Sequence, residues 1–215
     1  MTSGLFPIRI CIEGNIGSGK EDIVNLLKTH FNNNRTIFIP DVINNWKNKE
    51  NLEKFYTETS KYAFITEIKS TVDKINSISN IKKQIIFFNK SWISIKECFV
   101  KTLHETKFLT DLEKDTYDKT YNALISKDEP TIDLIIYVKN SPRKCYENIM
   151  QRNIKYENNI TLNFLTKLHN YYEKWMSTSN HHIYVVNIES LSEEQFINDI
   201  FNFLPAFKKI YTKSV

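Results

Sequence analysis

The chain has 215 residues, 41% of them hydrophobic and 13% aromatic, which excludes a disordered or collagen-like chain and favours one domain over residues 1–215. Its 29 basic and 25 acidic residues give a net charge of +4 and are spread along the chain, so we expect neither nucleic-acid binding nor a membrane anchor. The three cysteines, Cys11, Cys98 and Cys145, lie far apart, which excludes a disulfide framework and favours reduced thiols in the cytoplasm.

The first half of the chain alternates predicted strands with predicted helices. Residues 8–12 form a β-branched run that predicts a strand, and the spacing of apolar residues at 22–30 predicts a helix after it. In chain order, the next segments are a strand at 36–39 that Pro40 ends, a helical region at 51–80, a strand at 84–88 and a helical region at 91–126.

The second half continues this alternation. In chain order it holds a strand at 131–138, a helix that Ser141 caps and Pro142 begins, a helix at 162–176, a strand at 183–188, and a last helix with a capping box of Ser192 and Gln195. Strands that alternate with helices indicate an α/β fold, in which five parallel strands are covered by helices on both faces.

A glycine-rich loop joins the first predicted strand to the first predicted helix. Three of the chain's four glycines fall within its seven residues, which are Gly14, Asn15, Ile16, Gly17, Ser18, Gly19 and Lys20. The order fits G-x-x-x-x-G-K, in which glycines let backbone N–H groups approach phosphate oxygens and the lysine adds positive charge. A strand before the loop and a helix after it favour a site for the phosphates of ATP over a turn without a ligand.

The residue after the lysine departs from this motif. Ser or Thr usually stands there and supplies a hydroxyl to magnesium, but this chain has Glu21. Three interpretations stay open: charge repulsion that weakens nucleotide binding, a substitute magnesium ligand, and an acidic residue that the helix dipole favours. Repulsion weighs more than substitution, because the carboxylate stands next to the phosphate loop.

Further segments follow the loop in a characteristic order. These are DVINNW at 41–46, NLEKFY at 51–56, YAFITE at 62–67 and the region 142–175. Together with IEGNIGSGK at 12–20, they resemble the deoxynucleoside kinase family, which includes deoxycytidine, deoxyguanosine and viral thymidine kinases. The resemblance implies a three-layer P-loop sandwich with strand order 2-3-1-4-5, a helical lid at about 148–160 and a homodimer. It also implies that ATP and magnesium serve to phosphorylate the 5′-hydroxyl of a deoxynucleoside.

Carried over position by position, the resemblance assigns roles to individual residues. The catalytic positions hold Lys20, Asp41, Lys90 and Arg152, with Asp41 as the general base in place of a glutamate. The substrate positions hold Tyr56 and Glu157 at the sugar 3′-hydroxyl, Trp46 and Phe64 around the base, and Glu67 where an amide reads the base. A carboxylate lacks the donor half of the amide's contact, so base choice should differ or be lost.

Several positions depart from the family pattern. Asn89 and Lys90 stand where the family has glutamate and arginine after its third strand, and Ile95 stands where it has aspartate. The lid region keeps Arg152 but has Asn148 and Ile154 in place of further arginines. Because arginines stabilise the transferring phosphoryl group, their loss argues for weak or lost activity. The alternative is an inactive member of the fold that serves as a scaffold or interaction component with a protein partner. The Asn-, Ile- and Lys-rich composition suits an AT-rich genome, such as that of a large DNA virus or a parasite.

Overall fold

A five-stranded parallel sheet forms the centre of the computed structural model, which describes residues 7–46, 50–79, 81–125 and 131–204. The strands are β1 (Ile8–Glu13), β2 (Thr36–Ile39), β3 (Ile85–Asn89), β4 (Leu134–Lys139) and β5 (Ile183–Asn187). Neighbouring strands are parallel, and their order is β2-β3-β1-β4-β5. This confirms the predicted α/β class and the predicted strand order.

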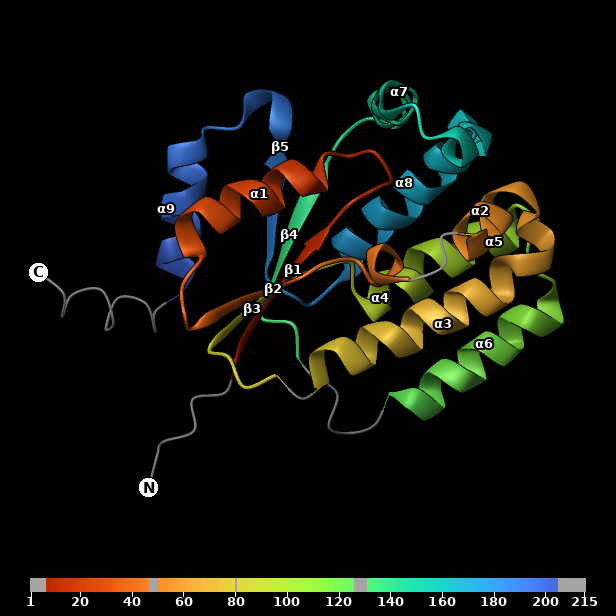
Figure 1. Ribbon diagram of the computed structural model, residues 1–215, viewed down its shortest axis with the longest axis horizontal. Coiled ribbons are helices and arrows are strands. Elements are labelled where there is room, and N and C mark those ends of the chain that lie inside the picture. The colour runs from red at the N-terminus through yellow and green to blue at the C-terminus, as the bar shows by residue number, and fades with distance from the viewer. Residues whose placement is uncertain (1–6, 47–49, 80, 126–130, 205–215) are drawn as a thin grey trace, which may run out of the picture.

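Helices cover both faces of the sheet, as Figure 1 shows. One face carries α1 (Lys20–Phe31) and α9 (Glu193–Phe203). The other carries α3 (Thr59–Ser79), α4 (Trp92–Ser94), the π-helical segment η2 (Ile95–Val100), α5 (Lys101–Glu105), α6 (Asp111–Leu124) and α8 (Leu162–Thr178). The remaining described elements are α2 (Glu50–Thr57), α7 (Pro142–Arg152), and the turns η1 (Val42–Asn45), η3 (Lys155–Asn159) and η4 (Ile188–Ser190). No described helix is both long and apolar enough to span a membrane.

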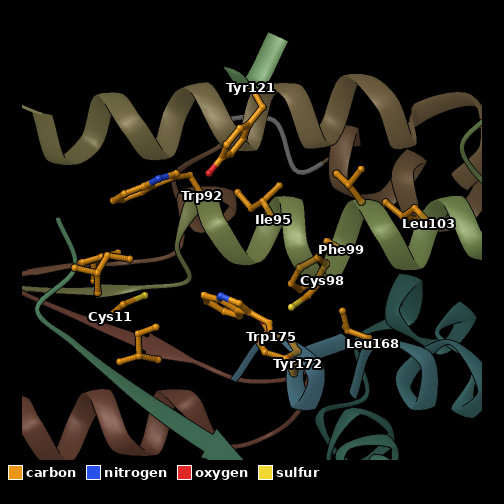
Figure 2. Packing of buried hydrophobic residues seen from close by; sticks show 14 of the residues in the cluster. Cys11, Trp92, Ile95, Cys98, Phe99, Leu103, Tyr121, Leu168, Tyr172 and Trp175 are labelled. Carbon is orange, nitrogen blue, oxygen red and sulfur yellow. The ribbon is translucent and has the colours of Figure 1, made fainter. Parts of the chain in front are cut away.

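Each face of the sheet packs against its own apolar core. Alternation along β1 sends Ile10 and Ile12 toward α1 and α9, and Cys11 toward the opposite helices. Figure 2 shows the second core, in which Trp92 of α4 and Tyr172 of α8 are both completely or almost completely buried. Burial of each such large side chain contributes about 1.5–3 kcal/mol to folding. Because both faces of the central strands are covered, these strands are mainly apolar, and their polar residues lie at or near the strand ends.

The helical region predicted at 51–80 is two helices, and its last residue lies outside the described residues. Helix α2 ends at Thr57 and α3 begins at Thr59. Glu58 stands between them, yet its N–H still donates to the carbonyl of Lys54 at 2.8 Å. Because neither glycine nor proline marks this break, the apolar spacing alone predicts one helix.

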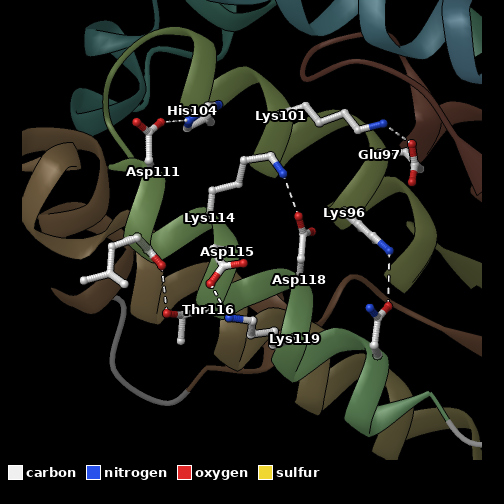
Figure 3. Close-up of polar contacts among 12 residues, drawn as sticks. Lys96, Glu97, Lys101, His104, Asp111, Lys114, Asp115, Thr116, Asp118 and Lys119 are labelled. Atoms are coloured by element: carbon white, nitrogen blue, oxygen red, sulfur yellow. Dashed lines mark hydrogen bonds and ion pairs between the residues drawn. The ribbon is translucent and has the colours of Figure 1, made fainter.

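The region predicted as helical at 91–126 is also divided, and residue 126 lies outside the described residues. Lys107 has a φ of 63°, a left-handed conformation that ends the run of α4, η2 and α5. A capping box of Thr110 and Glu113 then begins α6. Figure 3 shows the pair of His104 and Asp111, 2.7 Å apart, which joins the two helices across this turn. The T-x-x-E pattern at 110–113 is a sequence signal for the start of a helix, although the apolar spacing continues across it.

Several other boundaries shift by one to three residues. The strand predicted at 131–138 begins three residues later and ends one residue later, at Lys139. Before it, the carboxylate of Asp133 accepts a hydrogen bond from the Arg9 N–H at 2.8 Å. The strand predicted at 8–12 extends by one polar residue, Glu13, and the strand predicted at 84–88 is shifted by one residue and ends at Asn89. The strand predicted at 183–188 ends one residue earlier, at Asn187.

The predicted helix caps are confirmed in one case and half confirmed in the other. Ser141 caps α7 by accepting from the Lys144 N–H, and Pro142 is the first residue of that helix. Ser192 likewise accepts from the Gln195 N–H at 3.4 Å. The side chain of Gln195, however, donates to Asp199 at 2.7 Å, so the reciprocal half of the predicted capping box is not formed.

Candidate functional site

The glycine-rich loop packs tightly against β4 and α7. Gly17 has a φ of 76°, which residues with a side chain rarely adopt. A Cβ atom at Gly17 would lie 2.4 Å from the carbonyl oxygen of Cys145, and one at Gly14 would lie 2.5 Å from that of Val138. The neighbouring backbone therefore requires glycine at both positions, and the loop can turn its N–H groups toward a phosphate.

Two polar side chains of the loop behave differently. The amide of Asn15 donates to the carbonyl of Leu165 at 2.9 Å and ties the loop to α8. The hydroxyl of Ser18 is buried and has no hydrogen-bond partner among the described residues. A buried hydroxyl without a partner is costly, and a phosphate oxygen in the loop would supply one.

Lys20 begins α1 and reaches back over the loop. Its ammonium donates to the carbonyl oxygens of Gly14 at 2.8 Å and Asn15 at 2.6 Å. Burial lowers the pKa of Lys20 to about 8, although the charges of Glu13 and Asp41 oppose this effect. At neutral pH the side chain is therefore mostly protonated and can exchange the two carbonyls for phosphate oxygens.

Glu21 contacts the end of β3. Its Oε1 accepts a hydrogen bond from Nδ2 of Asn89 at 3.0 Å. Glu21 and Asn89 are both positions where the sequence departs from the pattern of phosphate-loop kinases, and the fold brings them together. The carboxylate is thus engaged by an amide outside the glycine-rich loop, so it does not take the place of a phosphate.

A cavity of about 530 Å³ lies beside the loop. The predicted site residues that line it are Ile16, Gly17, Ser18, Gly19, Lys20, Glu21, Asp41, Tyr56, Lys90, Arg152 and Glu157. Five predicted residues do not line it, namely Gly14, Asn15, Trp46, Phe64 and Glu67. Side chains from the phosphate loop, α2, α7 and the ends of β2 and β3 therefore meet around one space, at the carboxyl ends of the strands.

Asp41 and Lys90 follow β2 and β3 and place opposite charges on this cavity. Asp41 also precedes η1, where its Oδ1 accepts from the Ile43 N–H at 3.5 Å. Lys90 has a φ of 61°, and its N–H donates to the carbonyl of Ile12 at 3.0 Å. Its ammonium lies 3.5 Å from the centre of the Phe99 ring, a cation–π contact that positions the charge.

The predicted lid consists of the end of α7 and the turn η3. Nη2 of Arg152 lies 3.3 Å from Oε2 of Glu157. Burial raises the pKa of Glu157, and the charge of Arg152 opposes this shift. Asn148 donates to the carbonyl of Gly17 at 2.8 Å. The amide at this position therefore supports the phosphate loop, whereas an arginine there would carry a charge.

Tyr56 of α2 stands between the lid and the acidic side of the cavity. Burial raises the pKa of its hydroxyl, and the nearby carboxylates of Glu157, Glu67 and Asp41 raise it further. Its ring stacks on that of Tyr156, with centroids 5.7 Å apart. Tyr56 therefore stays neutral and can donate a hydrogen bond into the cavity.

Glu67 lies on α3, away from the cavity wall. It is 3% exposed, and its Oε2 has no hydrogen-bond partner among the described residues. Burial raises the pKa of Glu67 to about 7, while Lys90 lowers it and Asp41 raises it. A protonated carboxyl both donates and accepts, as an amide does. The Glu67 side chain therefore lacks a hydrogen-bond donor, as the sequence predicts, only at a pH above about 7.

Trp46 and Phe64 pack between the helices. The indole N–H of Trp46 donates to Asp73 of α3 at 2.9 Å, and the ammonium of Lys69 lies 5.1 Å from its ring. Phe64 is partly buried against the larger core. Both contacts fit the role of core aromatic residues, and neither places the ring on the cavity wall.

Two buried charged residues beneath the site have no counterpart in the sequence prediction. Glu13 is fully buried at the end of β1 and accepts from the N–H and hydroxyl of Ser91 at 2.8 and 2.6 Å, and from the Tyr172 hydroxyl. Lys74 of α3 donates to the carbonyls of Pro40 at 3.2 Å and Asn89 at 2.7 Å. Burial lowers the pKa of Lys74. In the sequence, the position of Glu13 next to Gly14 of the phosphate loop could have indicated a role at the site. The apolar spacing around Lys74 gave no such indication.

Comparisons with known proteins agree with this geometry. The family model for deoxynucleoside kinases matches residues 10–209. A probable deoxycytidine kinase of fowlpox virus is 30% identical over 199 residues, which cover 89% of this chain and 81% of the relative. Rat deoxycytidine kinase is 26% identical, with 86% of this chain and 80% of the relative covered. The mitochondrial deoxyguanosine kinase of Xenopus laevis is 25% identical, with 89% and 83% covered. The sheet order, the phosphate loop and these matches together show that the chain belongs to the deoxynucleoside kinase family.

Proposed function

We propose that the chain transfers the γ-phosphoryl group of ATP to the 5′-hydroxyl of a deoxynucleoside. The observation that carries the proposal is the cavity beside the glycine-rich loop, because Lys20, Asp41, Lys90 and Arg152 all line it. ATP brings the phosphoryl group, and Mg²⁺, which we assign to Glu21, offsets the charge of its phosphates. The unpartnered hydroxyl of Ser18 and the close-packed glycines fit a bound phosphate.

On the phosphate side, Lys20 supplies a positive charge to the β and γ phosphates. Its hydrogen bonds to two backbone carbonyls hold the ammonium over the loop before a ligand binds. The side chain therefore loses little further conformational freedom when the phosphates bind. Lys90 adds a second charge near the acceptor side of the cavity, fixed by the ring of Phe99.

On the sugar side, Asp41 accepts the proton of the 5′-hydroxyl as general base. Its shorter side chain, compared with glutamate, requires the hydroxyl to lie close to the end of β2. Tyr56 and Glu157 bind the 3′-hydroxyl as donor and acceptor, which the neutral state of Tyr56 supports. Trp46, Phe64 and Glu67 form the more distant surroundings of the base.

The proposal includes a low turnover number. Arginine residues contribute about 10³–10⁵ to the rate of related phosphoryl transfers. Residues 148–160 contain Arg152 as their single arginine, and it is paired with Glu157. Asn148 and Ile154 bring no charge to the transferring group.

The test is a phosphorylation assay on purified protein with ATP, Mg²⁺ and each of the four deoxynucleosides, with products separated by chromatography. Deoxycytidine comes first, because two of the compared relatives are named as deoxycytidine kinases. We expect product formation that Lys20→Ala and Asp41→Asn lower at least about 10²-fold. Lys28→Ala, which changes an exposed lysine of the same helix, is the matched control. Absence of 5′-monophosphate with all four substrates, from protein that binds ATP, overturns the proposed activity.

The second candidate is a catalytically inactive protein that uses the same cavity for binding and serves as a scaffold or interaction component. The substitution of Asn89, Ile95, Asn148 and Ile154 at positions that carry charge in the family favours it. ATP binding without turnover, together with capture of a specific protein partner, is the result that would distinguish this function from the first.

We also propose a homodimer in the cytoplasm. Free thiols at all three cysteines support a reducing compartment. Light scattering coupled to size exclusion tests the assembly: the expected mass is twice the 25.5 kDa of one chain.

A further inference from the structure

Glu13 is a fully buried carboxylate whose two oxygens contact different elements. Oε1 accepts hydrogen bonds from the backbone N–H and the hydroxyl of Ser91 at 2.8 and 2.6 Å, and from the thiol of Cys11 at 3.2 Å. Oε2 accepts from the hydroxyl of Tyr172, on α8, at 3.2 Å. Glu13 does not line the cavity beside the phosphate loop, so any effect that it has on a ligand must pass through these partners.

The first oxygen supports the backbone of Lys90. This lysine has a φ of 61°, a conformation that a residue with a side chain keeps only where its surroundings impose it. On one side, the N–H of Lys90 donates to the carbonyl of Ile12 at 3.0 Å. On the other side, Glu13 binds the next residue, Ser91, whose hydroxyl also caps α4. The end of β1 therefore holds the strained residue from both directions.

The second oxygen supports the ring on which the Lys90 ammonium lies. The Tyr172 ring packs edge-on against the Phe99 ring, with centroids 6.3 Å apart and planes at 85°. The ammonium of Lys90 lies over the Phe99 ring, 3.5 Å from its centre. Burial raises the pKa of the Tyr172 hydroxyl, and the charge of Glu13 raises it further, so this hydroxyl stays protonated and donates. One carboxylate thus contacts both the backbone support and the ring support of Lys90.

The Lys90 side chain has need of such support. A lysine carries its charge at the end of a flexible four-carbon stem. Within the described ranges, the ammonium of Lys90 makes no hydrogen bond or ion pair, so the ring of Phe99 is what positions its charge at the cavity. A displacement of about 1 Å can lower the rate of a catalysed reaction about 10²-fold.

We propose that Glu13 is a positioning residue that holds the ammonium of Lys90 at the cavity wall. It acts on the backbone through Ser91 and on the aromatic ring through Tyr172. The inference rests on the proposed function, in which Lys90 supplies charge near the acceptor side of the cavity. A carboxylate with a purely structural role would stabilise the fold without a particular effect on Lys90.

The direct measurement is an NMR spectrum of the chain labelled with ¹³C-lysine. Protons that lie over an aromatic ring resonate at lower frequency, so the ε-methylene of Lys90 should give a displaced signal, which Lys90→Met assigns by removing it. We expect Glu13→Ala to return this signal to the range of exposed lysines. Tyr172→Phe should move it part of the way, because this variant removes one of the two contacts and keeps the ring.

Tyr184→Phe is the matched control for Tyr172→Phe. The hydroxyl of Tyr184 also donates to a carboxylate, that of Asp199, at 2.7 Å. Its ring also lies against a phenylalanine, Phe196, with centroids 5.6 Å apart, on the other face of the sheet. This variant should leave the Lys90 signal where the native chain has it.

Kinetics separate positioning from stability. We expect Glu13→Ala to lower kcat about 10- to 100-fold, with a smaller change in the KM for ATP. In a chain that already carries Lys90→Met, Glu13→Ala should lower kcat no further, although it lowers the melting temperature in both chains. A purely structural role predicts that kcat falls by the same factor in both chains.

Circular dichroism and thermal unfolding verify the fold of each variant, and Tyr172→Phe decides the test if Glu13→Ala does not fold. The inference is overturned if the native chain has no displaced Lys90 signal, or if that signal stays in place in Tyr172→Phe and in folded Glu13→Ala. It is also overturned if the losses in kcat multiply in the double variant. A Lys90 signal that moves as expected, in a chain that forms no phosphorylated product, supports the positioning role and contradicts the proposed activity alone.

Discussion

The phosphate-loop end of the cavity is shaped by backbone, whereas the lid end is shaped by side chains. At the phosphate end, Gly14 and Gly17 touch the carbonyls of Val138 and Cys145, and a chain with any other residue there must move. At the lid end, Arg152 and Glu157 depend on pairing and burial, and Glu67, outside the cavity wall, depends on protonation. Backbone geometry tolerates a change of neighbouring side chains such as Glu21, so the shape of the loop is kept while the charges around the cavity vary.

The largest expected effect is at the backbone end. Gly17→Ala should abolish ATP binding and lower the free energy of unfolding by about 2–4 kcal/mol, because a methyl group meets the Cys145 carbonyl and the φ of 76° is strained. Urea unfolding and calorimetry measure the two effects.

The matched variant is Asn153→Ala, which places alanine at another left-handed position, with a φ of 51° at the exposed end of α7. It carries the strain of the backbone without the collision, so its effect should be clearly smaller. Equal losses in the two variants would mean that steric contact with β4 and α7 does not shape the loop.

The next effect concerns Glu67 and has a defined sign. The pKa of Glu67 is raised from its ordinary value of 4.5 to about 7, so the folded state binds a proton more tightly than the unfolded state. Its contribution to stability is complete below pH 4.5 and is lost as the pH rises to about 7, a change of about 2–4 kcal/mol. Urea unfolding between pH 5 and 8 should show this decline, and Glu67→Gln should remove it.

Glu194→Gln, at an exposed glutamate, controls for the loss of one negative charge and should keep the pH dependence of the native chain. A slope that survives in Glu67→Gln would assign the titration to another group. If substrate binds, its affinity should become independent of pH in Glu67→Gln, because an amide donates at every pH.

The smallest expected effect is at the lid. Arg152→Ala should lower kcat by about tenfold with little change in KM, well short of the 10³–10⁵ that an arginine supplies in related reactions. The reason is that the side chain is paired with Glu157 and is 43% exposed, which weakens its field at the transferring group. Steady-state kinetics with Arg152→Lys as the conservative variant measures this. A loss of 10³ or more would show that side chains at the lid are as decisive as the backbone of the loop.

Local patterns were enough to predict the strands, the phosphate loop and the cap of α7. The breaks in the helical regions predicted at 51–80 and 91–126 were not predicted, because Glu58 and Lys107 are not residues that usually end helices. The second break did leave a trace in Thr110 and Glu113, which shows that capping patterns deserve equal weight with apolar spacing.

The sequence predicts site positions, most of which the fold brings to one cavity, but it does not predict the protonation of their side chains. The resemblance assigned Glu67 to the base, but only its burial reveals that a proton is retained near neutral pH. The hydrogen bond between Glu21 and Asn89 joins residues 68 apart in sequence. Neither the motif nor the composition indicates that these two side chains meet. The same holds for Lys74, whose polar partners lie on two strand ends.

The two hydrogen bonds of Lys74 bear on how substrates enter and leave. The buried ammonium of this lysine donates to the carbonyls of Pro40 and Asn89. These two hydrogen bonds connect the ends of β2 and β3. The residues that follow them, Asp41 and Lys90, therefore move as one rigid wall. We expect exchange of ligands to come from movement of α7 and η3, which the Arg152–Glu157 ion pair and the contacts of Asn148 and Tyr156 restrain. We therefore expect ligands to enter and leave on the microsecond-to-millisecond scale of such lid motions.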